Sequence, residues 1–228
     1  MTRRKVTHTR PGAGGRKSDR RGRGRSRTGP GLFGLLGALV VAAIIAFVAA
    51  GGGDGRESSA PGRVTVTGQS LPALPEGSDP AVGLPAPTLE GRDFEGRPVR
   101  IEDDGRPKAI IFLAHWCPHC QREVPLVQDW LDREGMPAGV DLYSVATAID
   151  PAQPNYPPDE WLRREGWTPP VLVDDAKESA ASAYGLTGFP FWVFVDADGN
   201  VTSRFAGELT IDQLQGYLAT ISTQPGAP

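Results

Sequence analysis

The spacing of hydrophobic positions divides the chain into segments of different kinds. The first long apolar run is residues 32–50, nineteen residues without a charge or a proline. Beyond residue 84, apolar runs of strand length alternate with stretches whose apolar positions recur at helical spacing. This alternation over residues 84–222 predicts an α/β domain with a central mixed sheet flanked by helices.

The elements of this domain follow from the local pattern. Residues 89–101 predict a hairpin that turns at Glu95-Gly96, and the continuous apolar run 109–114 predicts a strand buried on both faces. A helix is expected from Cys117 to Glu134, with one apolar face. The later expected elements are strand 140–146, helix 158–165, strand 170–173, helix 177–184, strands 191–195 and 201–205 around a tight turn, and helix 211–221.

Two segments carry too few apolar positions for a core. Residues 51–83 are rich in Gly, Pro and Ser and predict a flexible linker between the apolar run and the domain. Residues 223–228 are expected to be a disordered tail.

The charges on either side of the apolar run indicate its role. Residues 1–31 carry eleven Lys and Arg and one acid, whereas the chain from residue 51 onward carries thirteen Lys and Arg against twenty-six Asp and Glu. A helix of nineteen residues reaches about 28 Å, close to the thickness of a bilayer's hydrocarbon core. Residues 32–50 therefore predict a transmembrane anchor, with residues 1–31 as a basic cytoplasmic tail and the domain extracytoplasmic.

Two other interpretations of this region compete with the anchor. Val48-Ala49-Ala50 has the small residues of a signal-peptide cleavage site, but the apolar run is longer than such peptides usually have. The Arg- and Gly-rich run 21–27 is typical of nucleic-acid binding, yet beside a membrane span its charges are expected as a topology signal. We therefore expect a single-pass protein of the cell membrane with no nucleic-acid partner.

The chain has two cysteines, Cys117 and Cys120. A close pair cannot link distant parts of a fold, which favours redox chemistry. Trp116 and Cys117 follow the buried strand directly and open the helix, where free backbone N–H groups favour a thiolate. Pro118 suits the first helical turn. His119, when protonated, would stabilise the thiolate further and make the reduced form easier to reach.

This arrangement predicts the division of labour between the sulfurs. Cys117 attacks a substrate disulfide, and Cys120, one turn deeper in the helix, resolves the mixed disulfide. The redox-active disulfide Cys117–Cys120 needs no cofactor and no metal. A zinc site would have only His115 and His119 nearby, at poor spacing, and haem attachment would need a histidine at position 121.

The run Phe112–Pro125, FLAHWCPHCQREVP, closely resembles the TlpA/ResA-like membrane-anchored thioredoxin-family thiol–disulfide oxidoreductases. The resemblance covers residues 84–222 and implies a thioredoxin-like fold that acts on protein thiols and disulfides. It also implies proton transfer by the glutamate three residues after the second cysteine, here Glu123. A carboxylate one turn beyond Cys120 could take the resolving thiol's proton, although an exposed helix charge is an equal alternative.

Thioredoxin-like proteins also place a cis-proline loop against the cysteines. Phe189 and Pro190 match that position and are expected to bind the substrate chain. Phe189 and the likewise bulky Phe191 and Trp192 could line an apolar peptide groove. Thioredoxin has a buried aspartate at the position that Ile111 occupies here. Without that carboxylate, proton transfer is expected to depend more on Glu123.

The sequence leaves the direction of electron flow open. The family resemblance suggests a reductant, recycled by a membrane redox partner, whereas Pro118-His119 matches DsbA-type oxidases. Two other functions remain as alternatives, a copper or metallochaperone role for the cysteines and a non-catalytic thioredoxin-like adaptor.

Overall fold

The computed structural model describes residues 62–222. The predicted cytoplasmic tail 1–31, transmembrane anchor 32–50 and C-terminal tail 223–228 lie outside the described residues. Between residues 62 and 222, no helix is both long and apolar enough to cross a membrane.

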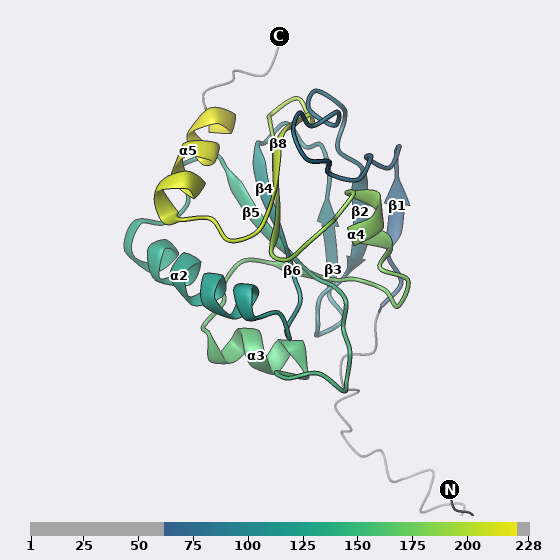
Figure 1. Ribbon diagram of the computed structural model, residues 1–228, viewed down its shortest axis with the longest axis vertical. Helices are drawn as coiled ribbons and strands as arrows, with labels where there is room; N and C mark the ends of the chain where they lie inside the picture. The colour runs from purple at the N-terminus through teal and green to yellow at the C-terminus, as the bar shows by residue number, and fades with distance from the viewer. Residues whose placement is uncertain (1–61, 223–228) are drawn as a thin grey trace, which may run out of the picture. The chain divides into compact units, whose positions relative to one another are not determined.

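A mixed sheet forms the centre of the described domain (Figure 1). Its strands run in the order β1-β2-β6-β5-β4-β7-β8, and β3 pairs with β2. The elements in chain order are β1 (Thr65–Thr67), β2 (Thr88–Arg92), β3 (Pro98–Ile101), β4 (Lys108–Leu113), α2 (Pro118–Glu134), β5 (Asp141–Ala146), α3 (Pro158–Arg164), β6 (Val171–Val173), α4 (Ser179–Ala183), β7 (Phe191–Val195), β8 (Val201–Ala206) and α5 (Ile211–Ser222).

The predicted buried strand is the centre of the sheet. β4 runs parallel to β5 and antiparallel to β7, so both of its edges are paired. Its alternate side chains belong to two separate cores, with Ile111 on the helix face and Ile110 and Phe112 on the other. A strand covered on both faces explains the continuous apolar run.

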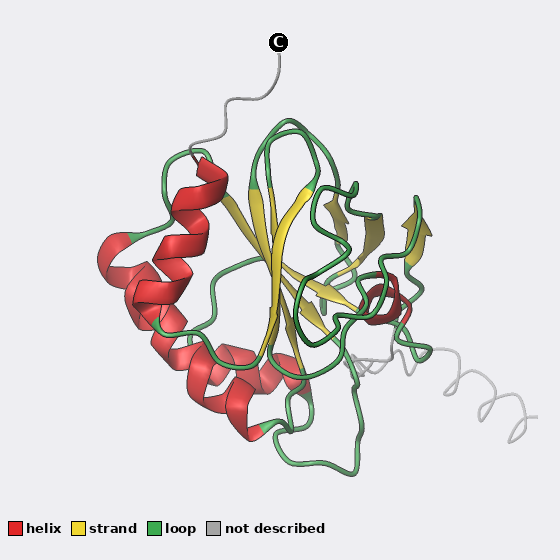
Figure 2. Cartoon of the chain, turned by 45° about the horizontal axis from the view of Figure 1, so that its top comes forward, coloured by secondary structure: helices red, strands yellow, loops and turns green. Residues whose placement is uncertain are grey.

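Helices cover the two faces of the sheet unequally. Figure 2 shows the longer helices on one side of the sheet and a short helix on the other. α2, α3 and α5 pack over the first core, which includes Trp130, Trp161 and Leu218. The short α4 packs over the second core through Ala180 and Ala183. The predicted central sheet flanked by helices is confirmed.

The predicted flexible linker 51–83 is wrong for its last part. β1 pairs with β2, and Leu71 is buried with its N–H donating to the carbonyl of Ala183 at 2.8 Å. Asp79 forms an ion pair with Arg204, whose side chain is fully buried. The segment has few apolar residues of its own, and the partners of Leu71 and Asp79 are more than one hundred positions away, which local pattern does not reveal.

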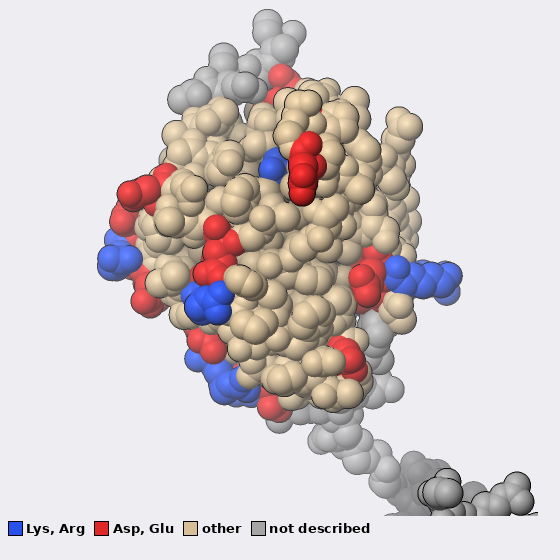
Figure 3. Space-filling model, viewed as in Figure 1, with Lys and Arg blue, Asp and Glu red and all other residues tan. Residues whose placement is uncertain are grey.

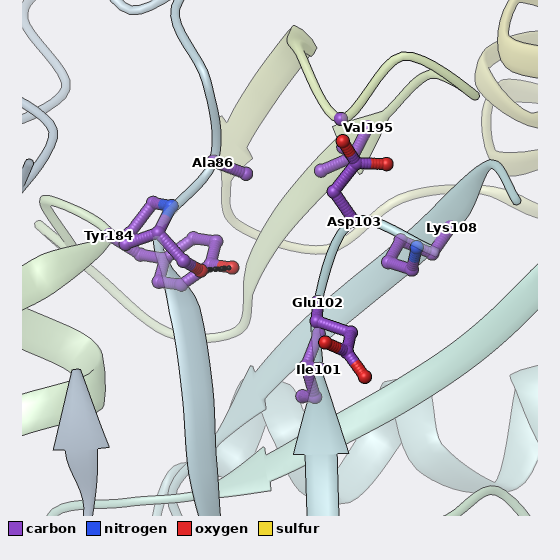
Figure 4. A pocket seen from close by; sticks show the side chains of 9 residues that line it. Ala86, Ile101, Glu102, Asp103, Lys108, Tyr184 and Val195 are labelled. Carbon is purple, nitrogen blue, oxygen red and sulfur yellow. Dashed lines mark hydrogen bonds between the residues drawn. The ribbon is translucent and has the colours of Figure 1, made fainter. Parts of the chain in front are cut away.

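A small internal cavity lies at the end of β3 (Figure 4). Side chains of Ala86, Asp103 and Tyr184 surround it, and its volume of about 10 Å³ leaves room for about one water molecule. The Tyr184 hydroxyl donates to the carbonyl of Pro87 at 2.6 Å. None of the lining residues belongs to α2 or to the loop before β7, so the cavity is separate from the cysteines.

Candidate active site

The cysteine pair lies where β4 gives way to α2. Cys117 is the N-cap residue of α2, in extended conformation, and Pro118 occupies the first turn. The N–H of Gln121 donates to the Cys117 carbonyl at 3.1 Å, which closes that turn. Both cysteines are free thiols, Cys117 with 5% of its surface exposed and Cys120 with none. Cys117 is thus the one that a partner sulfur can reach.

The loop before β7 lies against Cys117. The Phe189–Pro190 peptide bond is cis, as expected. The Cys117 Sγ lies 3.8 Å from the Phe189 carbonyl oxygen and donates to it. The Pro190 carbonyl accepts from the N–H of Gly207 at 2.8 Å, so this loop is fixed on its far side by the segment after β8.

Two aromatic rings border the accessible sulfur. Trp116 packs edge-on against Phe189 with 5.8 Å between ring centroids. The Trp116 indole N–H donates to the carbonyl of Ala148 at 2.8 Å, which fixes the ring in place. Both rings are half-buried and keep an exposed edge, as a surface that contacts a polypeptide requires.

Cys120 needs a base before it can react. Burial raises the pKa of the Cys120 thiol well above its ordinary value, and the negative charges of Cys117 and Glu123 raise this pKa further. The thiol therefore stays protonated at neutral pH unless a neighbouring group takes its proton.

Glu123 is the carboxyl whose charge acts on the Cys120 thiol. It lies one helical turn beyond Cys120 and is buried, with 1% of its surface exposed. Its Oε1 accepts from the Trp192 indole N–H at 3.1 Å and from the Leu209 N–H at 2.7 Å, while Oε2 has no hydrogen-bond partner. Burial raises the pKa of Glu123 to about 7, against the two hydrogen bonds that lower it. A carboxyl with this pKa can both take and return a proton near neutral pH.

The exposed-charge alternative for Glu123 is therefore wrong, and Phe191 and Trp192 do not line the expected apolar groove. Both aromatic residues are fully buried. Trp192 instead pairs across the sheet with Ile111 and holds Glu123. The buried carboxyl in this part of the core belongs to Glu123 of α2. Strand β4 contributes the apolar Ile111.

His119 has charged neighbours that the motif alone does not reveal. Its Nδ1 lies 2.5 Å from Oε1 of Glu208, in the segment between β8 and α5. Arg122 donates to the same carboxylate oxygen. An ionised carboxylate can only accept, so the His119 Nδ1–H and the Arg122 guanidinium both donate to Glu208, and their nitrogens lie 2.8 Å apart. Glu208 was not predicted from the sequence, because it is 89 positions from His119.

Comparison with known proteins places this site in a family. The sequence matches the Redoxin family over residues 81–220. The chain belongs to the Redoxin family. It is similar to thiol-disulfide oxidoreductase ResA of Bacillus thuringiensis (strain Al Hakam), with 28% identity over 142 residues that cover 62% of this chain and 79% of the relative. ResA of Oceanobacillus iheyensis is 29% identical over 148 residues, covering 63% and 74%.

Solved structures show the same fold. A thioredoxin-family thiol:disulfide interchange protein from Chlorobium tepidum superposes with a TM-score of 0.51 at 23% identity, covering 61% of this chain and 96% of that one. The thioredoxin domain of a thiol-disulfide oxidoreductase from Bacteroides vulgatus gives 0.50 at 22% identity, covering 61% and 96%. This member of the Redoxin family is a ResA/TlpA-like thiol–disulfide oxidoreductase with a thioredoxin-like fold.

The described part of this Redoxin-family chain holds no group of three or more His, Cys, Asp or Glu side chains placed to bind a metal ion. His115, the second histidine near the motif, has a different surrounding. It is buried, its Nδ1 lies 2.7 Å from the Pro154 carbonyl, and its Nε2 accepts from the Asp150 N–H at 3.3 Å. Nδ1–H is therefore the donor, and His115 holds the loop after β5 beside Trp116.

We expect acid to release this loop. Burial lowers the pKa of His115, so the unfolded chain binds the proton more readily, and stability falls as the pH drops below the ordinary histidine pKa of about 6.5. A protonated Nε2 can no longer accept from Asp150. Hydrogen exchange should show the protection factor of the Asp150 amide decreasing between about pH 7.5 and pH 5. His115→Gln, which does not titrate there, should show the same protection at both values. Equal protection of the wild-type amide at both values would contradict the role of His115.

Proposed function

We propose that this protein is an extracytoplasmic thiol–disulfide oxidoreductase that exchanges disulfides with secreted or membrane proteins through Cys117 and Cys120. One arrangement supports the proposal above all. A reachable sulfur stands at a helix N-terminus against the Phe189 carbonyl, with a buried second thiol and a carboxyl of raised pKa behind it. These are the parts that a two-step exchange needs.

In the reducing direction, the Cys117 thiolate attacks one sulfur of a substrate disulfide and forms a mixed disulfide. The other substrate sulfur leaves and takes up a proton. Glu123 then accepts the Cys120 proton, and the Cys120 thiolate attacks the Cys117 sulfur. The second substrate thiol is released. The two electrons that reduced the substrate disulfide came from Cys117 and Cys120, which are now joined as a disulfide. In the oxidising direction the same steps run in reverse.

The loop before β7 would dock the substrate. An extended substrate chain can hydrogen-bond to backbone groups beside Pro190 while its disulfide faces Cys117. Phe189 and Trp116 supply apolar contact on the same side. This docking through backbone groups would accept proteins of different sequence.

The proposed location rests on the sequence. The apolar run 32–50 follows a tail with eleven Lys and Arg, which favours a retained anchor with the tail in the cytoplasm and the catalytic domain outside. A membrane redox partner would then recycle the pair without a soluble cofactor.

Trapping tests the proposal. In Cys120→Ser, the mixed disulfide on Cys117 cannot be resolved by Cys120, so we expect covalent complexes with extracytoplasmic proteins to accumulate in cells. Non-reducing gels and mass spectrometry of the purified complexes would detect them. The matched control is Cys117→Ser with Cys120 intact, which should trap nothing because Cys120 is fully buried.

Two results would contradict the proposal. Equal trapping by both variants would mean that Cys117 is not the attacking residue. An unchanged cellular function in Cys117→Ser would favour the non-catalytic adaptor.

A further inference from the structure

The segment that follows β8 contacts three separate parts of the active site with three successive residues. The Gly207 N–H donates to the Pro190 carbonyl at 2.8 Å. The Glu208 carboxylate accepts from His119 and Arg122. The Leu209 N–H donates to Glu123 at 2.7 Å. The docking loop, the residue between the cysteines and the proton acceptor are thus held by one short segment, residues 207–209.

Glu208 is the only one of the three that acts through a charge. Its hydrogen bond from Arg122 lowers the pKa of the Glu208 carboxyl, so the group is ionised at neutral pH. Figure 3 shows acidic and basic side chains side by side over the part of the surface that α2 occupies, with mostly uncharged surface around them. The negative charge of Glu208 therefore lies beside the positive charge of Arg122, on the helix that begins just after Cys117.

We propose that Glu208 is a positioning residue that lowers the reduction potential of the Cys117–Cys120 pair by offsetting the positive charge that Arg122 presents to the Cys117 thiolate. The inference rests on the proposed function, because it concerns the potential of the same pair.

The sign follows from electrostatics. A positive charge near the thiolate stabilises the reduced form and makes the pair more oxidising. The hydrogen bond to Glu208 and, to a smaller extent, the thiolate of Cys117 raise the pKa of the Arg122 guanidinium, so Arg122 is within electrostatic reach of the sulfur. The negative charge of Glu208 opposes this stabilisation, both by pairing with Arg122 and by repelling the thiolate. Glu208 therefore makes this Cys-Pro-His-Cys pair a stronger reductant.

The test is the equilibrium of the full-length chain with glutathione. Protein disulfide and two glutathione molecules give protein dithiol and one glutathione disulfide. In Glu208→Gln we expect the equilibrium constant for this reduction to increase about fivefold, which is about 20 mV at about 30 mV per tenfold change. Because the charges are at the surface, the difference should shrink in about 1 M salt.

A matched control and a double variant separate charge from structure. Glu134 also links α2 to α5, through Gln215 at 2.8 Å, but lies at the other end of α2. Glu134→Gln should leave the potential unchanged. Adding Arg122→Gln to Glu208→Gln should return the potential toward the wild-type value, because the unpaired charge is removed.

The outcomes distinguish the two proposals. A wild-type pair that forms no reversible disulfide with glutathione would overturn the proposed function and the role of Glu208 with it. A normal wild-type equilibrium that Glu208→Gln leaves unchanged would overturn the role of Glu208 alone. A shift that persists in high salt, or that Arg122→Gln does not reverse, would also overturn it, because displacement of the 207–209 segment would then be the cause.

Discussion

Glu123→Gln is expected to stabilise the folded chain at about pH 8 while slowing its catalytic cycle. The pKa of Glu123 is raised from its ordinary value to about 7. The folded chain therefore holds this proton more tightly than the unfolded chain, and stability falls as the pH rises from about 4.5 to about 7. Above that range, the buried charge costs of order 3 kcal/mol, and glutamine carries no charge.

Urea unfolding at about pH 8 and about pH 4.5 would measure this difference. Glutamine keeps an oxygen to accept from Trp192 and Leu209, so the variant should be more stable than wild type at the higher pH and similar at the lower one. The exposed Glu134→Gln should show neither effect. Equal stability of Glu123→Gln and wild type at the higher pH would show that the folded chain does not resist ionisation of Glu123.

The same variant should resolve mixed disulfides slowly. Without the carboxylate, the Cys120 proton has no acceptor, and loss of a general base typically costs about 100-fold or more in rate. Stopped-flow measurement of the second step, started from a mixed disulfide on Cys117, would detect this. If the second step of Glu123→Gln is as fast as that of wild type, Glu123 does not take the Cys120 proton.

Arg204→Met is expected to destabilise the domain by about 3–5 kcal/mol, because it leaves one member of a buried ion pair without its partner. The Arg204 side chain is fully buried and pairs with Asp79 at 2.6 Å. It also donates to the carbonyls of Pro72 and Tyr184, each at 2.8 Å. Its hydrogen bond is the main cause that holds the pKa of Asp79 below its usual range, so in the variant burial acts on this carboxyl without that compensation.

Urea unfolding would measure the loss, and limited proteolysis would locate it in residues 62–83. The double variant Asp79→Leu/Arg204→Met removes the unpaired carboxyl and should recover part of the stability. Arg97→Met, at an ion pair whose arginine side chain is 72% exposed, is the control and should cost less than about 1 kcal/mol. A cost that small for Arg204→Met would mean that the N-terminal segment is held by its apolar contacts alone.

Much of the fold could be predicted because its signals are local. The run 109–114 predicted the central strand β4 to within one residue at each end, and the periodic positions after Cys117 predicted α2, which begins one residue later than expected. The hairpin of β7 and β8 followed from the turn 196–200. The segment 62–83 could not be predicted, since its order depends on Arg204 and Ala183 rather than on its own composition.

The active site divides in the same way. The sequence by itself placed Cys117, Cys120 and Glu123 at consecutive turns of one helix, because helix geometry is a local property, but it left Glu123 open between proton transfer and an exposed helix charge. Only the tertiary structure decided what surrounds them. Burial against Trp192 and Leu209 sets the pKa of Glu123, and Glu208 reaches His119 across 89 positions of chain. Desolvation and charge pairing depend on which distant segments pack together, and no local pattern in the sequence records that.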